Sequence, residues 1–351
     1  MTYQLTIEPI EALVDVADGQ PLLVACLRVG VWLAHACGHG LGGTCKVQVL
    51  EGDVEHGDAS PFALMDLERD EGYTLACSAT ATSDVTIEAD VDEDPDAVSR
   101  PVRDFTGTVA RLEHLTGDIF GIWISLDEPI EFQAGQYVNL HVPGVDRPRA
   151  FSIASSPSSE KEIELHVRLV PGGEATPRLH SELAVGDQVR FSGPYGRFFV
   201  RRSAAKPMLF LAGGSGLSSP KSMVLDLLET GYEQPITLIH GVRTANDVYF
   251  AEEFTALEAA HENFTYVPVL SEHDPTAGEW DGETGFVNEA AERRFDGSFK
   301  GMSAYLCGPP PMIEACIRSL MKGRLFERDI FTEKFVTAAD GESSLARSPL
   351  F

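Results

Sequence analysis

The sequence feature that most constrains the fold of this chain is a glycine-rich loop, residues 36–45, which is bracketed by Cys37 and Cys45. Glycine lets a backbone wrap closely around an inorganic centre and point its N–H groups at bridging sulfide. A third cysteine, Cys77, follows in the same part of the chain. Because six cysteines in 351 residues are too few for a disulfide scaffold, this clustering favours a metal-binding role.

The N-terminal part of the sequence is typical of a small domain with strands and a helix. Alternation at period two predicts strands at residues 3–7 and 46–50, and helical spacing predicts a helix over residues 22–31. The acidic stretch 88–96 contains a proline and repels itself, so we expect it to be an exposed connection. A first domain is therefore expected at residues 1–95.

The middle and C-terminal parts have different patterns. Residues 103–202 contain short alternating runs, such as 136–142 and 163–169, separated by glycine and proline, which predicts an antiparallel barrel or sandwich. Over residues 205–337 apolar strands alternate with helices, which predicts a parallel sheet with crossover helices. Residues 338–351 are expected to form a tail. The strands expected in the C-terminal part are 208–211, 236–239 and 304–306, and the helices are 221–229 and 312–321.

Composition excludes some partners. Asp and Glu number 54 against 27 Lys and Arg, and the net charge of −27 would repel a nucleic acid backbone. The longest apolar stretch, residues 21–37, is interrupted by Arg28 and is too short to span a bilayer. Without a basic leader segment, we expect a cytoplasmic protein that contacts neither nucleic acid nor membrane.

Glycine-rich and polar motifs follow in the two later domains. The barrel region carries Arg149-Ala150-Phe151-Ser152 and the loop 172–176. The C-terminal region has a glycine-rich turn, 212–220, between a strand and a helix, where a phosphate would meet a helix N-terminus. Gly214 and Gly216 match G-x-G-x-x-G, with Ser219 in place of the third glycine. Later, Cys307 begins a Cys-Gly-Pro-Pro motif after a strand. Taken alone, each motif is better explained by turns or core packing than by a binding role.

Together, and in this order, the motifs resemble a known family. Residues 37–45 and Cys77 resemble the plant-type ferredoxin loop, C-x4-C-x2-C with a distant fourth cysteine. The later motifs resemble the flavin barrel and nicotinamide domain of ferredoxin-NADP reductase-like proteins. The chain is thereby similar to the reductase component of bacterial multicomponent oxygenases, most of all to phenol hydroxylase-type reductases. The implied fold is multi-domain α+β and α/β, with a β-grasp ferredoxin domain, an antiparallel flavin-binding β-barrel and a parallel-sheet nicotinamide-binding domain.

The resemblance also implies roles for particular residues. Arg149 would pair with the FAD pyrophosphate, Phe151 would face the flavin ring, and Ser152 would hydrogen-bond near flavin N5. Cys307 would lie beside the nicotinamide, which with Ser152 makes the expected catalytic pair, and Phe335 would cover the flavin face that nicotinamide occupies. The other residues expected to bind a cofactor are Tyr137, His166, Arg168, Gly173, Thr176, Gly213, Gly214, Gly216, Arg243, Gly308 and Pro309.

The metal site departs from the family pattern at one position. The resemblance assigns Cys37, Cys45 and Cys77 as ligands of a 2Fe-2S cluster, but the second ligand position falls on Gly42, which has no side chain. Three interpretations remain open. A cluster forms with three thiolates and a substitute such as His39 or solvent; the cluster is lost or labile; or Cys26, whose spacing is more typical of a core residue, has moved into the site. Zinc lacks the support of a paired C-x2-C motif.

The function implied by the resemblance is an NADH-dependent reductase. It would pass electrons from NADH through FAD and the 2Fe-2S cluster to the oxygenase component of a phenol or aromatic monooxygenase system. Arg243, at a strand end where a 2′-phosphate can bind, leaves NADPH open as the donor. The alternatives are an NADH:flavin oxidoreductase whose ferredoxin domain lost its cluster through Gly42, and a non-enzymatic interaction module.

Overall fold

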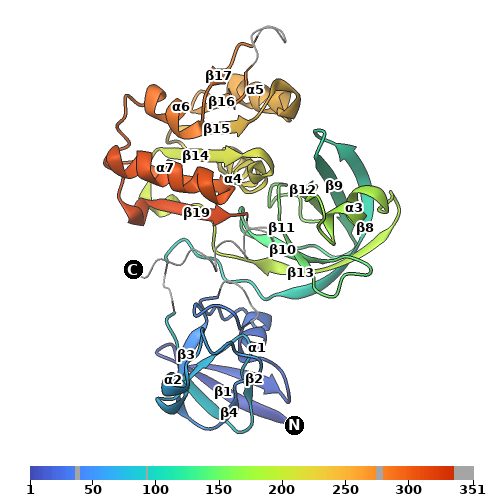
Figure 1. The fold of residues 1–351 in the computed structure, drawn as a ribbon, viewed down its shortest axis with the longest axis vertical. Coiled ribbons are helices and arrows are strands. Elements are labelled where there is room, and N and C mark those ends of the chain that lie inside the picture. The colour runs from blue at the N-terminus through green and yellow to red at the C-terminus, as the bar shows by residue number, and fades with distance from the viewer. Residues whose placement is uncertain (36–39, 92–93, 274–279, 336–351) are drawn as a thin grey trace. The chain divides into compact units, whose positions relative to one another are not determined.

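The computed structural model describes residues 1–35, 40–91, 94–273 and 280–335. The chain divides into two compact units, Met1–Arg103 and Asp104–Phe351, which are blue and cyan-to-red, respectively, in Figure 1. The predicted ligand Cys37, its neighbour His39 and the predicted tail 338–351 lie outside the described residues.

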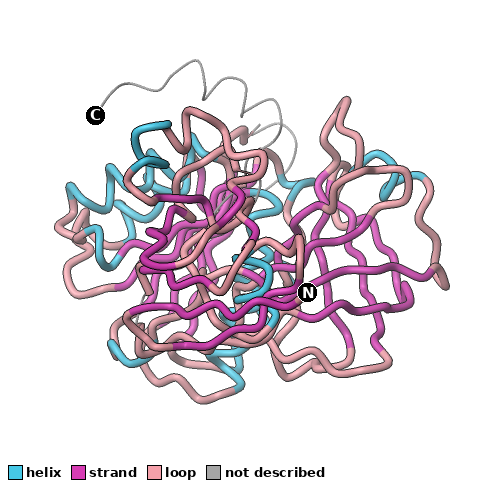
Figure 2. Tube along the Cα trace, turned by 90° about the horizontal axis from the view of Figure 1, so that it is seen from below, coloured by secondary structure: helices cyan, strands magenta, loops and turns pink. Residues whose placement is uncertain are grey.

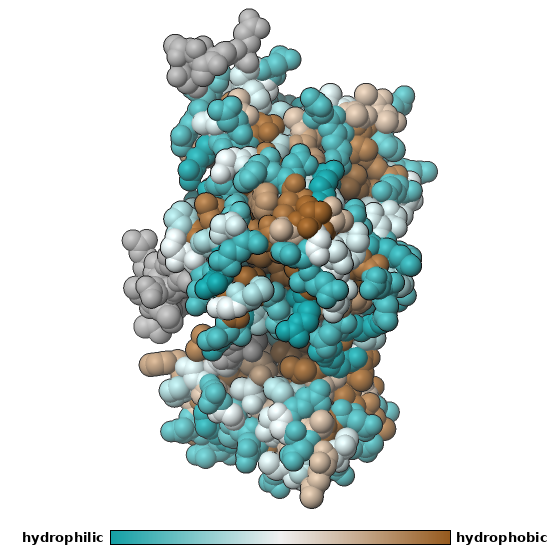
Figure 3. Space-filling view, turned by 90° about the vertical axis from the view of Figure 1, so that its right-hand side faces the viewer, coloured by the Kyte–Doolittle hydropathy of each residue, from teal (hydrophilic) through white to brown (hydrophobic). Residues whose placement is uncertain are grey.

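Hydrophilic side chains cover much of the face drawn in Figure 3, with hydrophobic ones between them. This surface belongs to a chain whose net charge is −27. Among the helices that the structure describes, none is both long and apolar enough to cross a membrane.

The first unit is a mixed sheet with two short helices. In chain order its elements are β1 (Thr2–Glu8), β2 (Ala12–Ala17), α1 (Leu22–Arg28), β3 (Lys46–Glu51), β4 (Val54–Glu55), α2 (Asp66–Asp70), β5 (Tyr73–Leu75), β6 (Thr80–Ala81) and β7 (Val85–Glu88). Five strands form one sheet in the order β2-β1-β7-β3-β5. β1 pairs antiparallel with β2 and parallel with β7. The strands predicted at residues 3–7 and 46–50 are confirmed as β1 and β3.

Helix α1 covers the core of this unit but is shorter than the pattern predicted. It ends at Arg28 instead of residue 31, because the chain turns at Gly30, whose φ of +81° suits glycine alone. The Arg28 guanidinium then donates to the Val102 carbonyl (3.3 Å). Cys26 is fully buried on the inner side of α1, which confirms its interpretation as a core residue.

The second unit begins with an antiparallel sheet. Its elements are β8 (Arg103–His114), β9 (Ile119–Leu126), β10 (Tyr137–His141), β11 (Arg149–Ser152), β12 (Glu162–Arg168), α3 (Thr176–Ser181) and β13 (Gln188–Tyr195). The strand order is β11-β10-β13-β8-β9-β12. An antiparallel bridge between Ile153 and Leu165 joins the two outer strands, so the sheet closes toward a barrel as predicted. Apart from α3, this part is almost wholly strand and loop (Figure 2).

A parallel sheet follows in the same unit. Its elements are η1 (Arg202–Ala204), β14 (Met208–Gly213), η2 (Gly214–Leu217), α4 (Ser218–Glu229), β15 (Ile236–Val242), η3 (Ala245–Asp247), α5 (Ala251–Ala260), β16 (Phe264–Leu270), β17 (Glu283–Thr284), α6 (Val287–Arg294), β18 (Ser303–Gly308), α7 (Pro310–Lys322), η4 (Glu327–Asp329) and β19 (Ile330–Lys334). The order β17-β16-β15-β14-β18-β19 is parallel throughout. The predicted parallel sheet is confirmed.

The strand order of this sheet has a switch point at β14 and β18. β14 has β15 on one side and β18 on the other, so the chain leaves β14 and β18 in opposite directions along the sheet. Such a switch point leaves a crevice at the carboxyl ends of the strands, where α/β proteins bind ligands. The glycine-rich turn (residues 213–217) follows β14 there, and Ala212 is in register with Cys307.

Aromatic side chains hold these central strands together. The ring of Tyr305 on β18 stacks on Phe210 of β14 (centroids 5.1 Å apart) and on Phe331 of β19 (5.0 Å). The Tyr305 hydroxyl also accepts a hydrogen bond from the Arg201 N–H (2.8 Å). Tyr305 is fully buried, so the three strands share one core residue.

Replacing Tyr305 therefore tests this packing. Tyr305→Ala removes a fully buried aromatic ring and leaves a cavity, which is expected to lower the free energy of unfolding by about 3 to 5 kcal/mol. Urea unfolding followed by circular dichroism measures the loss. Met321→Ala, at an exposed position of the neighbouring helix α7, is the control. A loss below about 1 kcal/mol in Tyr305→Ala would contradict the central role of the ring.

Candidate active site

Three hydrogen-bond donors converge on the carboxylate of Glu333 in the second unit. The hydroxyl of Ser152 lies 3.0 Å from Glu333 Oε2 and that of Ser219 lies 2.6 Å from the same atom. The Cys307 thiol lies 3.6 Å from it. These four residues, here called the Glu333 cluster, include both residues predicted as catalytic from the sequence, Ser152 and Cys307.

The fold brings the cluster together from four elements. Ser152 ends β11 of the barrel, and Ser219 lies in the first turn of α4. Cys307 and Glu333 are partners in the register of β18 and β19. The cluster thus lies where the barrel and the carboxyl end of the parallel sheet meet, and neither part contains it alone.

Burial decides the protonation of the cluster. It raises the pKa of the Cys307 thiol well above its usual value, and the nearby Glu333 carboxylate raises it further. Burial also raises the pKa of Glu333, although the hydrogen bonds from Ser219, Ser152 and Cys307 oppose this shift. Burial, followed by the charge of Glu333, raises the pKa of Tyr137 to about 12. Cys307 is therefore a protonated thiol and not a thiolate nucleophile.

The glycine-rich turn forms an open cradle beside the cluster. Gly214 has φ +53°, and a side chain there would meet nothing within 4 Å. A Cβ on Gly216 would lie 2.3 Å from the Cys307 carbonyl oxygen, so this close approach requires glycine. The turn leads into α4, whose N-terminal N–H groups suit an anion. Gly213 is close to Met312 on α7, where a Cβ would lie 2.5 Å from the sulfur.

On the barrel side, the residues predicted to hold a flavin lie along two paired strands. Tyr137 on β10 is in register with Ser152 on β11, and its ring stacks on Tyr195 at 5.6 Å between centroids. Phe151 is partly buried against the barrel core. Arg149 is 38% exposed and forms an ion pair with Glu174 (3.2 Å), so its guanidinium is accessible to a ligand phosphate.

Other predicted barrel residues make local contacts. Arg168 is half-exposed and donates from Nε to Asp118 (2.9 Å). The Thr176 hydroxyl accepts from the Val170 N–H (2.9 Å) at the start of α3, and the Gly173 N–H donates to the Val170 carbonyl (2.9 Å). His166 is buried and bonded to Glu164. Their roles toward a cofactor stay predictions.

The remaining predicted residues surround the carboxyl ends of the parallel strands. Arg243 follows β15 and is exposed, with its carbonyl accepting from the Glu272 N–H (2.8 Å). Gly308 ends β18 with φ +150°, and Pro309 is the N-cap of α7. Phe335 follows β19, where its N–H donates to the Gly308 carbonyl (3.0 Å).

In the first unit, two of the three predicted metal ligands meet. Cys45 and Cys77 lie with their sulfurs 3.2 Å apart, and the Gly40 N–H donates to Cys77 Sγ (3.2 Å). The hydrogen bond with Cys77 lowers the pKa of Cys45 to about 6 against the opposing effect of burial, so Cys45 is poised to bind as a thiolate. Within the described residues, no group of three or more His, Cys, Asp or Glu is placed to hold a metal.

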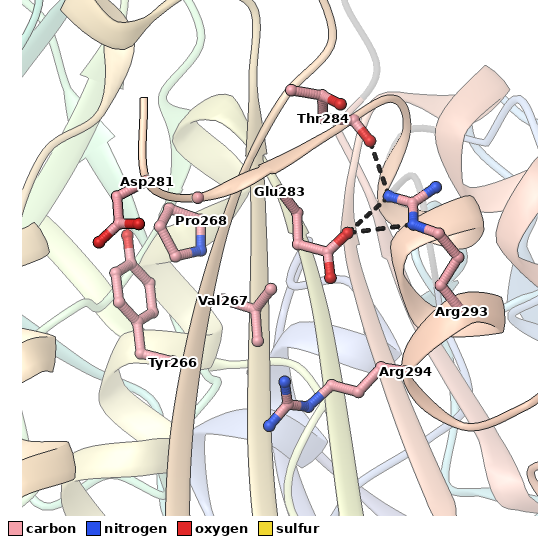
Figure 4. A pocket seen from close by; sticks show the side chains of 9 residues that line it. Tyr266, Val267, Pro268, Asp281, Glu283, Thr284, Arg293 and Arg294 are labelled. Atoms are coloured by element: carbon pink, nitrogen blue, oxygen red, sulfur yellow. Dashed lines mark hydrogen bonds and ion pairs between the residues drawn. The ribbon is translucent and has the colours of Figure 1, made fainter. Parts of the chain in front are cut away.

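A separate pocket of about 650 Å³ lies at the outer edge of the parallel sheet (Figure 4). It is lined by β16, residues 281–284 and the end of α6. Arg293 there is bound by the Glu283 carboxylate (2.7 Å) and the Thr284 carbonyl (2.7 Å). No residue predicted as a site residue lines this pocket, so it is not the candidate active site.

Comparison with known proteins agrees with the order of these parts. The 2Fe-2S iron-sulfur cluster binding domain model matches residues 5–82. The oxidoreductase FAD-binding domain model matches residues 108–200, and the oxidoreductase NAD-binding domain model matches residues 210–318.

Relatives match over the whole chain. The reductase component of phenol 2-monooxygenase from Pseudomonas sp. strain CF600 is 58% identical, over 100% of this chain and 99% of the relative. The phenol hydroxylase P5 protein from Acinetobacter pittii strain PHEA-2 is 53% identical, over 100% of this chain and 99% of the relative. This chain belongs to the family of phenol monooxygenase reductase components.

The fold of this chain is also similar to solved structures of reductases. The cytochrome P450 reductase of Amycolatopsis has a TM-score of 0.84 and 38% identity, covering 95% of this chain and 99% of that chain. The ferredoxin reductase of a carbazole 1,9a-dioxygenase has a TM-score of 0.76 and 26% identity, covering 96% of this chain and 99% of that chain. The expected three-part reductase fold is thereby confirmed.

Sequence reasoning missed two members of the Glu333 cluster as site residues. Ser219 was visible as the residue in place of the third glycine of the G-x-G-x-x-G pattern, and Glu333 lies two residues before the predicted Phe335. What the sequence did not show is that their oxygens lie 2.6 Å apart. That contact depends on β19 pairing with β18.

The pKa of Cys307 gives a test of the buried cluster. Because burial raises this pKa, the Cys307 thiol stays protonated at about pH 8.5. At that pH an ordinary exposed cysteine is about half ionised. Alkylation of Cys307 by iodoacetamide in the native protein is therefore expected to be more than about tenfold slower than that of a free cysteine in a short peptide. Mass spectrometry of the peptide that contains Cys307 measures the rate, and Cys307→Ser identifies its signal. Labelling at the peptide rate would contradict the burial.

Proposed function

We propose that this chain is an NADH-dependent reductase that passes electrons from NADH through FAD and a 2Fe-2S cluster to the oxygenase component of a phenol or related aromatic monooxygenase system. The observation that carries the proposal is the Glu333 cluster, which joins the flavin-type barrel to the crevice of the nicotinamide-type sheet. Family membership supports each of the three parts. The alternative of a reductase that has lost its cluster is not favoured, because the 2Fe-2S model matches residues 5–82.

The residues of the barrel fit a bound FAD. Arg149 would hold the pyrophosphate with its accessible guanidinium, and Tyr137 and Phe151 would contact the ring system. Bound FAD supplies the chemistry that accepts a hydride and releases single electrons. The Ser152 hydroxyl donates its hydrogen to Glu333 (3.0 Å), so its oxygen would act as a hydrogen-bond acceptor at the flavin edge.

The crevice of the parallel sheet fits the diphosphate of NADH. The cradle at Gly214 is open, and the N-terminus of α4 adds its dipole. Cys307, which burial keeps protonated, would pack against the nicotinamide without reacting with it. Phe335, beside Gly308, would cover the flavin until nicotinamide enters.

The described residues fit a 2Fe-2S cluster only in part. Cys45 and Cys77 converge and receive an N–H group from Gly40, which matches the surroundings of thiolate ligands. Gly42 offers no ligand atom. We propose that Cys37, Cys45 and Cys77 hold the cluster and that a group other than a cysteine completes it.

Three further features of the proposal rest on the family resemblance. We propose domain boundaries at residues 1–95, 103–202 and 205–337, with a tail at 338–351. We propose that the reductase acts in the cytoplasm, where NADH is available. Its proposed partner is the oxygenase component, which accepts the electrons.

Metal analysis of the purified protein tests the proposed electron path. Protein purified without oxygen is expected to contain about two irons and two acid-labile sulfides per FAD. NADH is expected to bleach both the flavin and the iron-sulfur absorbance in a rapid-mixing experiment. Flavin without iron would contradict the proposal, because no route for single electrons to the oxygenase would remain.

Gly42→Cys is the matched variant for this measurement. It adds a thiol at the vacant ligand position, so the iron-to-FAD ratio is expected to stay the same while iron is released to a chelator at least about tenfold more slowly. An equal rate of iron release in both proteins would show that position 42 does not face the metal.

A preference for NADH is the second prediction from the proposed function. We expect kcat/KM for NADH to exceed that for NADPH by about tenfold or more, a difference of about 1.4 kcal/mol. Arg243 is the exposed cation at the end of β15, where a 2′-phosphate would bind, so Arg243→Ala should lower the remaining NADPH activity more than the NADH activity. Higher kcat/KM with NADPH would contradict the choice of donor.

A further inference from the structure

A chain of buried polar side chains connects the barrel to the glycine-rich turn, and the Glu333 cluster does not use it. It consists of Glu164 and His166 on β12, Lys221 on α4 and Tyr249, which lies between η3 and α5. It ends on the carbonyl oxygen of Gly214. We call these four side chains the polar chain.

Its first link is an ion pair shielded from water. Lys221 Nζ lies 2.8 Å from Glu164 Oε2, and both side chains are 5% exposed. The ammonium group also lies 4.5 Å from the centroid of the Phe250 ring and 3.6 Å from the carboxylate of Glu253. Burial alone would raise the pKa of Glu164, but the hydrogen bond and charge of His166, together with Lys221, lower it to about 2. The Glu164 carboxyl group is therefore ionised at neutral pH and lies against the Lys221 ammonium group.

The second link connects the ion pair to the glycine-rich turn through His166 and Tyr249. His166 Nε2 lies 2.8 Å from Glu164 Oε1. Its Nδ1 lies 3.4 Å from the Tyr249 hydroxyl, which donates to the Gly214 carbonyl (3.1 Å). Burial lowers the pKa of His166. Its Nε2–H donates to the Glu164 carboxylate, and its ring packs edge to face against the Tyr249 ring, with centroids 5.3 Å apart. His240 lies 3.3 Å from the same Gly214 carbonyl.

The polar chain ends at Gly214 in the glycine-rich turn, and this turn contacts Cys307 of the Glu333 cluster. A Cβ on Gly216, two residues beyond the end point, would lie 2.3 Å from the Cys307 carbonyl. A movement of the turn therefore moves the backbone that carries Cys307 or opens a gap beside it. In a packed interior such displacements are transmitted instead of absorbed.

We propose that the polar chain Lys221–Glu164–His166–Tyr249 is a positioning device that fixes the glycine-rich turn, and with it the bound nicotinamide, relative to the flavin barrel. The inference rests on the proposed function, since it assigns positioning residues to that reaction. A charged pair on β12 and α4 has a cost in desolvation that packing alone would avoid. The pair fixes the barrel relative to the parallel sheet, because a buried ion pair is stable only while its two charged groups stay in contact.

Tyr249→Phe tests the proposal, since it deletes only the hydroxyl that contacts Gly214. Tyr266→Phe is the matched control: Tyr266 is a buried tyrosine of the same core cluster, and its hydroxyl has no hydrogen-bond partner among the described residues. Rapid mixing at saturating NADH measures the rate constant of FAD reduction. We expect it to fall about 10- to 100-fold in Tyr249→Phe and to change less than about twofold in Tyr266→Phe.

Four readouts separate positioning from loss of structure. FAD content and thermal midpoint are expected to be alike in the two variants. The long-wavelength charge-transfer absorbance of the NADH complex is expected to weaken in Tyr249→Phe alone. Without any nucleotide, the backbone amides of residues 213–217 are expected to exchange with deuterium faster in Tyr249→Phe than in Tyr266→Phe. An equal reduction rate and equal exchange in both variants would overturn the proposal.

Substitutions in the ion pair test the remote end of the polar chain. Lys221→Met leaves the Glu164 carboxylate buried without its cation, and is expected to slow FAD reduction as Tyr249→Phe does. The double variant Glu164→Gln with Lys221→Met removes both charges and is expected to recover at least part of the rate. A rate in Lys221→Met equal to that of the wild type would overturn the role of the pair. If NADH does not reduce the FAD of the wild-type protein, the proposed function is wrong. If NADH reduces the wild type but Tyr249→Phe and Tyr266→Phe are reduced at the same rate, only the inference about the polar chain is wrong.

Discussion

The convergence of Ser152, Ser219 and Cys307 on the Glu333 carboxylate is the interaction on which the rest of this reductase depends. The four residues come from the barrel, a helix and two strands of the parallel sheet, so the site exists only where these parts meet. A carboxyl group enclosed in this way would be costly without donors. Three donors on one carboxylate oxygen offset that cost and hold the hydroxyl and thiol in fixed positions.

The two buried polar systems of the second unit differ in chemistry. The Glu333 cluster disfavours charge, because burial raises the pKa of both Cys307 and Glu333. The polar chain holds charge, because His166 and Lys221 keep the pKa of Glu164 at about 2. Both systems join the barrel to the parallel sheet, and the glycine-rich turn lies between them, against Cys307 on one side and Tyr249 on the other. Hydride transfer needs such constraint, because a small misplacement of the reacting atoms costs much of the rate.

Much of the fold was predictable because it follows from short-range patterns. Period-two alternation located β1, β3, β10 and β12, and apolar runs between glycine-rich turns located β14 and β18. The helix ending at Arg28 was predicted too long, since Gly30 was not recognised as its stop. Motif order predicted the family, and with it the residues Ser152 and Cys307. The contacts of Ser219 with Glu333 and of Tyr249 with Gly214 could not be found this way, because they join elements that are far apart in the sequence.

The sequence by itself determined the three-part order of the chain, the glycine-rich turn and the vacancy at Gly42, because each is a property of neighbouring residues. Only the tertiary structure decided that Glu333 lies 3.0 Å from Ser152 and that Lys221 and Glu164 form a pair shielded from water. A lysine in a helix and a glutamate in a strand are normally solvated. Their burial depends on the contact of Lys221 on α4 with Glu164 on β12, which residue spacing along one element does not encode.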